Sequence, residues 1–209
     1  FDAVVLATPA PVSAALLASL PAAAELSGQL DALDHEPIAT CYLQYAPGTR
    51  LDLPFYALED GPAQGRWGQF VFDRAQLDPT QDGLLAVVVS AAGDAAGLSR
   101  EALAAAIAAQ LAHDLQRPDL AQPSWTQVIT EKRATFSCTP ALARPGVETG
   151  LPGLVLAGDY LASDYPATLE TAVRSGIAAA AAIRAWSALP REKRSLSHTH
   201  GATAPDSLQ

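Results

Sequence analysis

Residues 151–186 read LPGLVLAGDYLASDYPATLETAVRSGIAAAAAIRAW, and this stretch decides how the rest of the chain is interpreted. Residues 154–157 form a short apolar run that predicts a buried strand ending at the pair Gly158-Asp159. A loop closes in Pro-Ala-Thr (residues 166–168), and Pro166 is expected in the first turn of a long helix rich in small residues. The first amides of a helix lack acceptors and carry partial positive charge, and ligands of open α/β sheets gather at the carboxyl ends of strands. The stretch therefore predicts a place that holds a polar ligand.

A second strand–turn–helix unit opens the chain. Residues 3–7 (AVVLA) are a continuous apolar run, which predicts a strand buried on both faces. Thr8 stands where an N-cap belongs and Pro9 where the first helical residue belongs. The helix that follows is expected to bury one apolar stripe. Its members are Val12, Leu16, Leu17 and Leu20.

The middle of the chain has a different pattern. Four runs rich in β-formers are separated by turns that carry Gly and Pro, which predicts an antiparallel or mixed sheet. These runs are residues 38–45, 67–72, 84–90 and 125–136. One helix interrupts them, with Ser99 as its expected cap. Its apolar stripe consists of Leu103, Ile107, Leu111 and Leu115.

These patterns together predict a mixed α/β fold. The two strand–turn–helix pieces are expected to form one α/β layer, while the middle forms a second domain with a mixed or antiparallel sheet and helices. The expected boundaries are residues 1–30 and 150–186 for the outer pieces, 31–149 for the middle, and 187–209 for a flexible tail without apolar periodicity.

Composition excludes several classes of function. The 209 residues carry a formal net charge of −9, and such an acidic surface repels phosphate backbones, so nucleic acid is not expected as a partner. The two cysteines have no metal-binding spacing and are expected to be buried or half-buried thiols, although a disulfide between them stays open. The absence of Met leads us to expect a fragment or a trimmed chain. No uncharged apolar run is long enough to span a membrane, which leaves peripheral membrane contact open.

Several motifs indicate a family. The C-terminal stretch resembles the FAD-binding segment of the flavin amine oxidase and phytoene desaturase superfamily, and within it the squalene-associated branch of hydroxysqualene dehydroxylases. The matching segments are LAGDY (156–160), YPATLE (165–170), AVRSG (172–176), FDAVVLATP (1–9), GQFVFDR (68–74) and EKRATF (131–136). The glycine-rich GxGxxG motif that opens a dinucleotide-binding unit is absent from the sequence, so the FAD site is expected to be incomplete.

The resemblance implies an FAD site at the strand end and the helix start. Its expected residues are Gly158, Asp159, Pro166, Ala167, Thr168 and Leu169. The Asp159 carboxylate is expected to face the ribityl chain, and the helix tip to stabilise negative charge on a reduced flavin. A turn aspartate and an ordinary helix start are the alternative interpretations of the same residues. The small residues Ala172, Gly176 and Ala180 are expected to allow close packing of the helix on a sheet or on the cofactor. The sequence predicts no catalytic residue and no metal site.

The implied activity is FAD-dependent reductive removal of the hydroxyl group from hydroxysqualene, giving squalene for hopanoid biosynthesis. Carotenoid desaturation and amine oxidation remain open within the superfamily, and a non-catalytic lipid-binding module without flavin remains open outside it. An isoprenoid substrate and an N-terminal nucleotide-binding half are the expected partners, in the cytoplasm or at the periphery of the inner membrane. The chain alone is expected to bind FAD poorly. The expected walls for the hydrocarbon are Tyr42, Leu43, Trp67, Phe70, Phe72 and residues 87–89.

Overall fold

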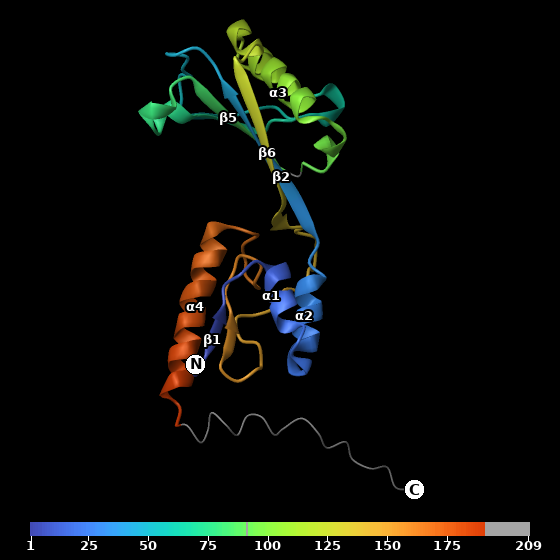
Figure 1. Cartoon of the computed structure of the whole chain (residues 1–209), viewed down its shortest axis with the longest axis vertical. Helices are drawn as coiled ribbons and strands as arrows, with labels where there is room; N and C mark the ends of the chain where they lie inside the picture. The colour runs from blue at the N-terminus through green and yellow to red at the C-terminus, as the bar shows by residue number, and fades with distance from the viewer. Residues whose placement is uncertain (91, 191–209) are drawn as a thin grey trace. The chain divides into compact units, whose positions relative to one another are not determined.

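The computed structural model describes residues 1–90 and 92–190, which form two compact units. Unit 1 combines Phe1–Asp34 with residues 136–190, and unit 2 is the continuous segment His35–Thr135 (Figure 1). The chain leaves unit 1 and returns to it at neighbouring points, because the Ser137 N–H donates a hydrogen bond to the Asp34 carbonyl at 2.8 Å. The structure therefore places residues 31–34 and 136–149 with the outer pieces.

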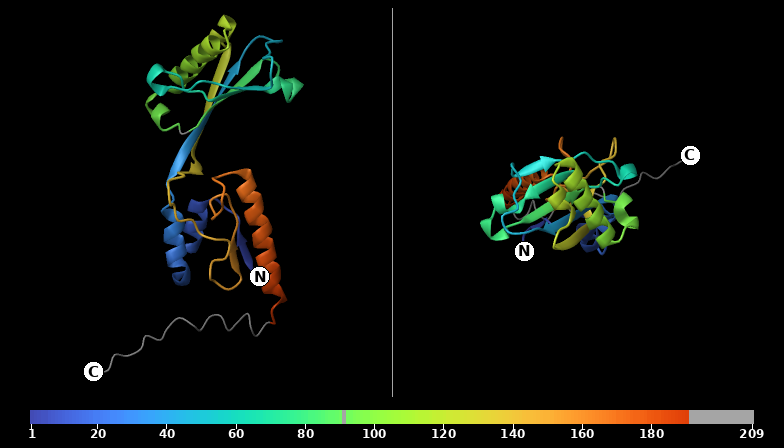
Figure 2. Two further views of the ribbon diagram at one scale, coloured as in Figure 1. Left: turned by 180° about the vertical axis from the view of Figure 1, so that it is seen from behind. Right: turned by 90° about the horizontal axis from the view of Figure 1, so that it is seen from above.

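Unit 1 has three layers. Its central layer is a parallel pair of strands, β1 (Val4–Leu6) and β7 (Leu154–Leu156). Helix α4 (Leu169–Ala188) covers one face, while α1 (Ala10–Leu17) and α2 (Ala24–Asp31) cover the other, as the views from both sides agree (Figures 1 and 2). This arrangement, together with the antiparallel sheet of unit 2, confirms the predicted mixed α/β fold.

The alternation of side chains along β7 gives unit 1 a separate core on each face of the strand pair. Val155 packs with Ala157 and Ala179 on the side of α4. Leu156 packs on the other side with Leu17 and residues of α2. Both cores use a strand of three residues, so the position of β7 depends on packing from two directions.

Strand β1 is less covered than the sequence predicts. The expectation that it is buried on both faces is wrong, because Val4 is 46% exposed and Val5 43%. Within the described residues β1 pairs only with β7, so one edge stays open. The expected cap is also wrong. Pro9 is the N-cap of α1 and offers no side-chain bond, while the Thr8 hydroxyl bonds the Ser13 hydroxyl at 2.8 Å.

Helix α1 turns a different face inward from the one predicted. The buried residues are Ala10, Ser13, Ala14 and Leu17. Of the predicted stripe only Leu17 is buried, because Val12, Leu16 and Leu20 are each about half exposed. Most residues of α1 are apolar, so hydrophobicity alone does not select a face. The small side chains face inward because they let α1 approach α2 closely.

Unit 2 is a five-stranded sheet in the order β3-β4-β5-β2-β6. Its strands are β2 (His35–Gln44), β3 (Phe55–Ala57), β4 (Phe70–Asp73), β5 (Leu84–Val89) and β6 (Trp125–Phe136). Neighbouring pairs among β2, β3, β4 and β5 are antiparallel. Hydrogen bonds from Ser124 to Gln44 and from Ser137 to Asp34 show that β6 also runs opposite to β2. The four predicted strands are confirmed. β3 was missed because three residues after a proline give no periodic signal.

Helix α3 (Arg100–Asp114) covers one face of this sheet (Figure 1). The Ser99 hydroxyl accepts a hydrogen bond from the Ala102 N–H at 3.1 Å, which confirms the predicted cap. Leu103, Ile107 and Leu111 are buried as expected, in a core with residues of β2, β4 and β5, while the fourth predicted residue, Leu115, is the C-cap and is half-buried against that core. Short 3₁₀ helices complete the described chain: Pro21–Ala23, Pro62–Gln64, Arg74–Gln76, Pro79–Gln81, Asp94–Gly97 and Pro118–Ala121.

The two cysteines are free thiols in different surroundings. Cys41 is buried in the core of unit 2, as expected, but the expectation is wrong for Cys138, which is exposed; the two form no disulfide with each other. Burial raises the pKa of the Cys41 thiol to about 12. This thiol is therefore a core side chain rather than a nucleophile at neutral pH.

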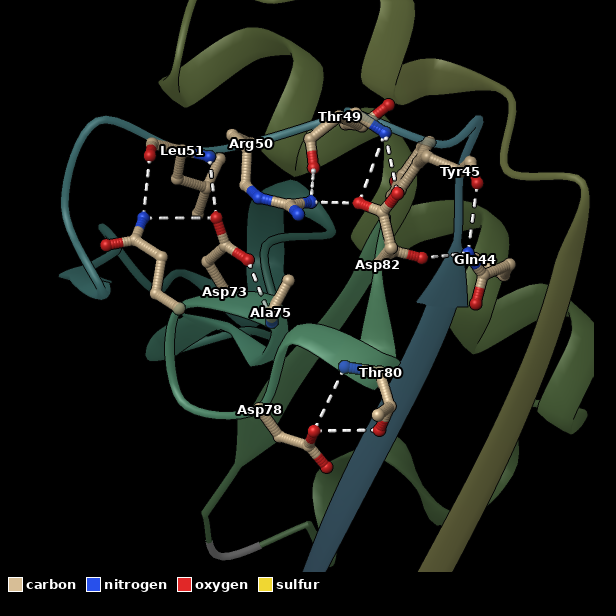
Figure 3. Close-up of polar contacts among 12 residues, drawn as sticks. Gln44, Tyr45, Thr49, Arg50, Leu51, Asp73, Ala75, Asp78, Thr80 and Asp82 are labelled. Carbon is tan, nitrogen blue, oxygen red and sulfur yellow. Dashed lines mark hydrogen bonds and ion pairs between the residues drawn. The ribbon is translucent and has the colours of Figure 1, made fainter.

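Carboxylates fix the turns at one end of unit 2 (Figure 3). Asp73 is fully buried, and its oxygens accept hydrogen bonds from the backbone N–H groups of Leu51 and Ala75. Asp82 accepts from the Gly48 N–H and pairs with Arg50. These side chains hold backbone donors, so we interpret them as structural.

Helix α4 continues through Ala188, so it includes Ser187 and Ala188 of the predicted tail. Residues 191–209, the rest of that prediction, lie outside the described residues. Among the helices in residues 1–90 and 92–190, none is long and apolar enough to cross a membrane.

Candidate functional site

The candidate site lies where β1 and β7 end. The strands are parallel and in register, so Leu6 and Leu156 bring their following loops to the same edge. The Ala157 N–H extends this pairing by donating to the Leu6 carbonyl at 2.9 Å. The loop after β1 begins at Thr8 and the loop after β7 begins at Gly158, so two segments far apart in the sequence meet at one edge of the sheet. This is the usual place for ligands in open α/β sheets.

A buried hydroxyl network connects the two loops. Ser13, which is fully buried, bonds the Thr8 hydroxyl at 2.8 Å and lies 3.3 Å from the Tyr160 phenol oxygen. Burial raises the pKa of the Tyr160 phenol, so it remains protonated at neutral pH. Ser13 and Tyr160 lie inside the fold and Thr8 is half-buried, so the two buried members of the network fix the loops from within.

Gly158 is required by close packing. A Cβ at this position would lie 2.3 Å from a ring carbon of Tyr160, which no side chain tolerates without a shift. Its N–H donates to the Ser175 hydroxyl at 2.9 Å, and that hydroxyl donates to the Ala172 carbonyl at 2.8 Å. These bonds join the end of β7 to the second turn of α4.

Asp159 follows at the same edge and is half-buried. Among the hydrogen bonds and ion pairs of the described residues, none involves its carboxylate. Its oxygens are therefore available to accept hydrogen bonds from a ligand.

The tip of α4 is open. Thr168 is the N-cap, and its hydroxyl accepts from the Thr171 N–H at 3.2 Å. Capping at Thr171 leaves the amides of Thr168, Leu169 and Glu170 without an acceptor inside the helix. Leu169 is 87% exposed, so the tip is not sealed in a core. These amides and the helix dipole favour negative charge at this point.

The residues before the tip differ slightly from the prediction. Pro166 was expected in the first turn of the helix, and this is wrong, because it lies two residues before the N-cap. The proline instead contributes its carbonyl, which accepts from the Thr171 hydroxyl at 2.9 Å. Ala167 packs on the core of unit 1. The predicted residues thus surround one helix start.

The small-residue stripe does not pack on the sheet. The buried face of α4 carries Thr171, Ser175 and Ala179. A Cβ added at Gly176 would meet no atom within 4 Å, and Ala180 is exposed. The expected packing of this stripe on the sheet is therefore wrong, because the neighbouring face of α4, with Thr171, Ser175 and Ala179, packs there instead.

The open face of the sheet in unit 2 is apolar. Phe55 and Phe72 stack with ring centroids 5.8 Å apart, and Phe70 is 42% exposed. Tyr42 and Val88 alternate with buried neighbours and therefore lie on the same face. For the other predicted wall residues the prediction is wrong, because their side chains pack on the opposite face of the sheet, against α3. They are Leu43, Trp67, Val87 and Val89. Phe55 was missed because it belongs to the unpredicted strand.

Comparison with known proteins gives three kinds of match. A family model described as flavin containing amine oxidoreductase matches residues 1–184. A hydroxysqualene dehydroxylase from Sinorhizobium fredii is 52% identical over 60 residues, which is 28% of this chain and 14% of that protein. A protein of the same name from Zymomonas mobilis is 37% identical over 108 residues, 48% of this chain and 24% of that protein. The matched part thus spans less than a quarter of these relatives.

Two solved structures share the fold at low identity. A putative protoporphyrinogen oxidase from Exiguobacterium superposes with a TM-score of 0.59 at 17% identity, covering 88% of this chain and 40% of that chain. Cyclohexylamine oxidase from Brevibacterium oxydans superposes with a TM-score of 0.55 at 17% identity, covering 87% and 42%. Both likenesses concern the arrangement of elements alone.

Proposed function

The chain belongs to the family of flavin-containing amine oxidoreductases, and from that premise we propose that it is part of an FAD-dependent enzyme that converts hydroxysqualene to squalene. The observation that carries the proposal is the open tip of α4 beside the end of β7. There, amides without acceptors and an available carboxylate lie at the carboxyl edge of a parallel strand pair. The names of the curated relatives support the choice of substrate.

The residues at the edge fit a flavin nucleotide. The Asp159 carboxylate can accept hydrogen bonds from the hydroxyls of a ribityl chain. The amides of Leu169 and Glu170 can donate to an anionic ring oxygen, and the helix dipole favours that charge. Gly158 keeps the end of β7 free of a side chain. When held by these residues, reduced FAD would supply the hydride for the carbon that loses its hydroxyl group; the hydroxyl would gain a proton and leave as water, and a cellular reductant would be needed to reduce the flavin again.

We assign the hydrocarbon to the open face of unit 2. A long isoprenoid offers almost no polar groups, so its binding depends on removing apolar surface from water. Phe55, Phe70 and Phe72 present aromatic surface on this face, and Tyr42 and Val88 extend it across the sheet. Under this proposal unit 1 is the FAD-binding domain and unit 2 the substrate domain.

The pyrophosphate of the dinucleotide requires residues beyond these. The GxGxxG motif is absent from the sequence, so we propose that another part of the same protein supplies it. That part would also cover the apolar side chains that unit 1 leaves exposed at β1 and α1, including Val4, Val5 and Leu16.

The test starts from the complete gene product. We expect it to purify with a visible flavin spectrum and, when reduced under anaerobic conditions, to convert hydroxysqualene to squalene. Asp159→Ala should weaken FAD binding about tenfold to a hundredfold, because a charged acceptor is lost. Asp31→Ala is the matched control, since it removes the same charge from an exposed position on α2.

Other outcomes contradict the proposal in distinct ways. A colourless protein that does not take up FAD would contradict the flavin assignment and favour a non-catalytic lipid-binding module. A flavoprotein that oxidises amines or desaturates phytoene but leaves hydroxysqualene unchanged would contradict the substrate assignment alone.

A further inference from the structure

The loop between β7 and α4 is fastened by a segment that belongs to no helix or strand. The Ala162 N–H donates to the Pro145 carbonyl at 2.9 Å. The neighbouring Arg144 guanidinium donates to two further backbone carbonyls, those of Ser163 and of Tyr165, the latter at 3.2 Å. Two adjacent residues thus hold the loop at three points along its backbone.

Arg144 is itself held in place. Its side chain is half-buried, and its guanidinium carbon lies 5.1 Å from the centroid of the Phe136 ring, which is almost fully buried. A guanidinium presents its donors in a rigid planar fork and stacks well on aromatic faces. One such fork can bond two carbonyls at once, which the single nitrogen of a lysine reproduces poorly.

Tyr165, whose carbonyl Arg144 holds, also contacts the first turns of α4. The Tyr165 ring lies under the guanidinium of Arg174, 5.1 Å from its carbon, and Arg174 forms an ion pair with Glu170 in the first helical turn. The next residue, Pro166, accepts a hydrogen bond from the Thr171 hydroxyl at 2.9 Å. A displacement of the loop at Tyr165 would therefore move the start of the helix.

We propose that Arg144 is a positioning residue for the flavin site. By holding the carbonyls of Ser163 and Tyr165 it fixes the loop that delivers the amides of Leu169 and Glu170 in one orientation. Preorganised donors cost no reorganisation when a charge develops in front of them. The inference rests on the proposed function, since it concerns how this chain prepares a place for the flavin.

The test uses the full-length protein and three variants. In Arg144→Gln we expect backbone amides of residues 162–169 to exchange with deuterium about tenfold faster, since charge-assisted bonds to the loop are lost. The Kd for FAD should rise about tenfold, and the visible absorption maxima of the bound flavin should shift. Arg144→Lys keeps the charge but not the planar fork, so its exchange rates and its Kd for FAD should lie between those of the wild type and of Arg144→Gln. Arg184→Gln removes the same charge from an exposed position on α4 and should match the wild type.

Each outcome bears on a different step. Unchanged exchange in the loop of Arg144→Gln overturns the inference. Faster exchange with unchanged FAD affinity and spectrum also overturns it, because the arginine would then hold a loop that the flavin does not sense. A wild type that binds no FAD overturns the proposed function, and this inference with it. If Arg144→Gln does not fold, the lysine variant decides, because loss of the fork alone must still loosen the loop.

Discussion

Gly158 illustrates how a single missing Cβ shapes the candidate site. The residue lies against the Tyr160 ring, and Tyr160 is anchored by burial and by the Ser13 hydroxyl. Gly176, in α4, has open space where its Cβ would be. The two glycines belong to the same sequence stretch, but only Gly158 lies where a Cβ has no room.

We expect opposite effects from alanine at these two positions. Gly158→Ala should lower the free energy of unfolding by about 1–3 kcal/mol, since the ring of Tyr160 must move within a packed core. Gly176→Ala should raise it by up to about 1 kcal/mol, because alanine favours the helix and meets no neighbour. Urea unfolding of the 209-residue chain measures both. Equal effects would show that the contact with Tyr160 is not what selects glycine.

Because of Cys41, we expect the free energy of unfolding to decrease at alkaline pH. Burial raises the pKa of this thiol from the ordinary value of 9.0 to about 12. Between these values the unfolded chain holds fewer protons than the folded one. The free energy of unfolding should therefore fall as pH rises above 9, by up to about 1.4 kcal/mol per pH unit from this group.

Cys41→Ala isolates that contribution. The variant loses core volume at every pH, but its stability should decline less steeply than that of the wild type between pH 9 and 11. Parallel curves from urea unfolding at each pH would contradict the assignment to Cys41.

At the scale of elements, α1 shows where sequence patterns stop being informative. Leu16 and Leu17 are adjacent and chemically identical, yet Leu16 is 54% exposed and Leu17 1%. We expect Leu17→Gln to lower the free energy of unfolding by about 2–5 kcal/mol, and Leu16→Gln to change it by no more than about 0.5 kcal/mol. Thermal and urea unfolding of the two variants provide the measurement. Similar losses from both would mean that α1 packs through its large side chains after all.

The contrast with α3 explains which elements could be predicted. In α3 large apolar residues recur every fourth position among alanines and Ser99 marks the start, so the cap and the buried stripe follow from the sequence. In α1 nearly every side chain is apolar, so the inward face is chosen by contacts with α2 that no local pattern contains. The exposure of β1 has the same origin, because burial of a strand depends on its neighbours.

The candidate site was partly predictable for a related reason. Strand end, loop and helix start are consecutive in the sequence, so Gly158, Asp159 and Thr168 could be grouped from their order. The Arg144 contacts could not. Their carbonyl partners lie 19 and 21 residues away in an irregular segment, and a lone arginine in such a segment carries no signal.

At the scale of the whole molecule, the core of unit 2 is self-contained. All of its buried residues, from Ala39 to Val128, come from the continuous segment His35–Thr135. We therefore expect that segment, expressed alone, to unfold in one cooperative transition by circular dichroism. Leu43→Ala removes a fully buried side chain and should lower the midpoint temperature of this transition. A gradual, non-cooperative melt would show that unit 2 depends on contacts with unit 1.

The hydrogen bond between Asp34 and Ser137 has a consequence for how such proteins diversify. Because the Ser137 N–H is hydrogen-bonded to the Asp34 carbonyl, unit 1 receives both ends of the segment His35–Thr135 at neighbouring positions, so the length of that segment affects unit 1 little. A lineage could exchange the segment His35–Thr135, or lengthen it, without rebuilding unit 1. If the proposed function holds, chimaeras grafted at this junction would change the substrate while keeping the flavin site.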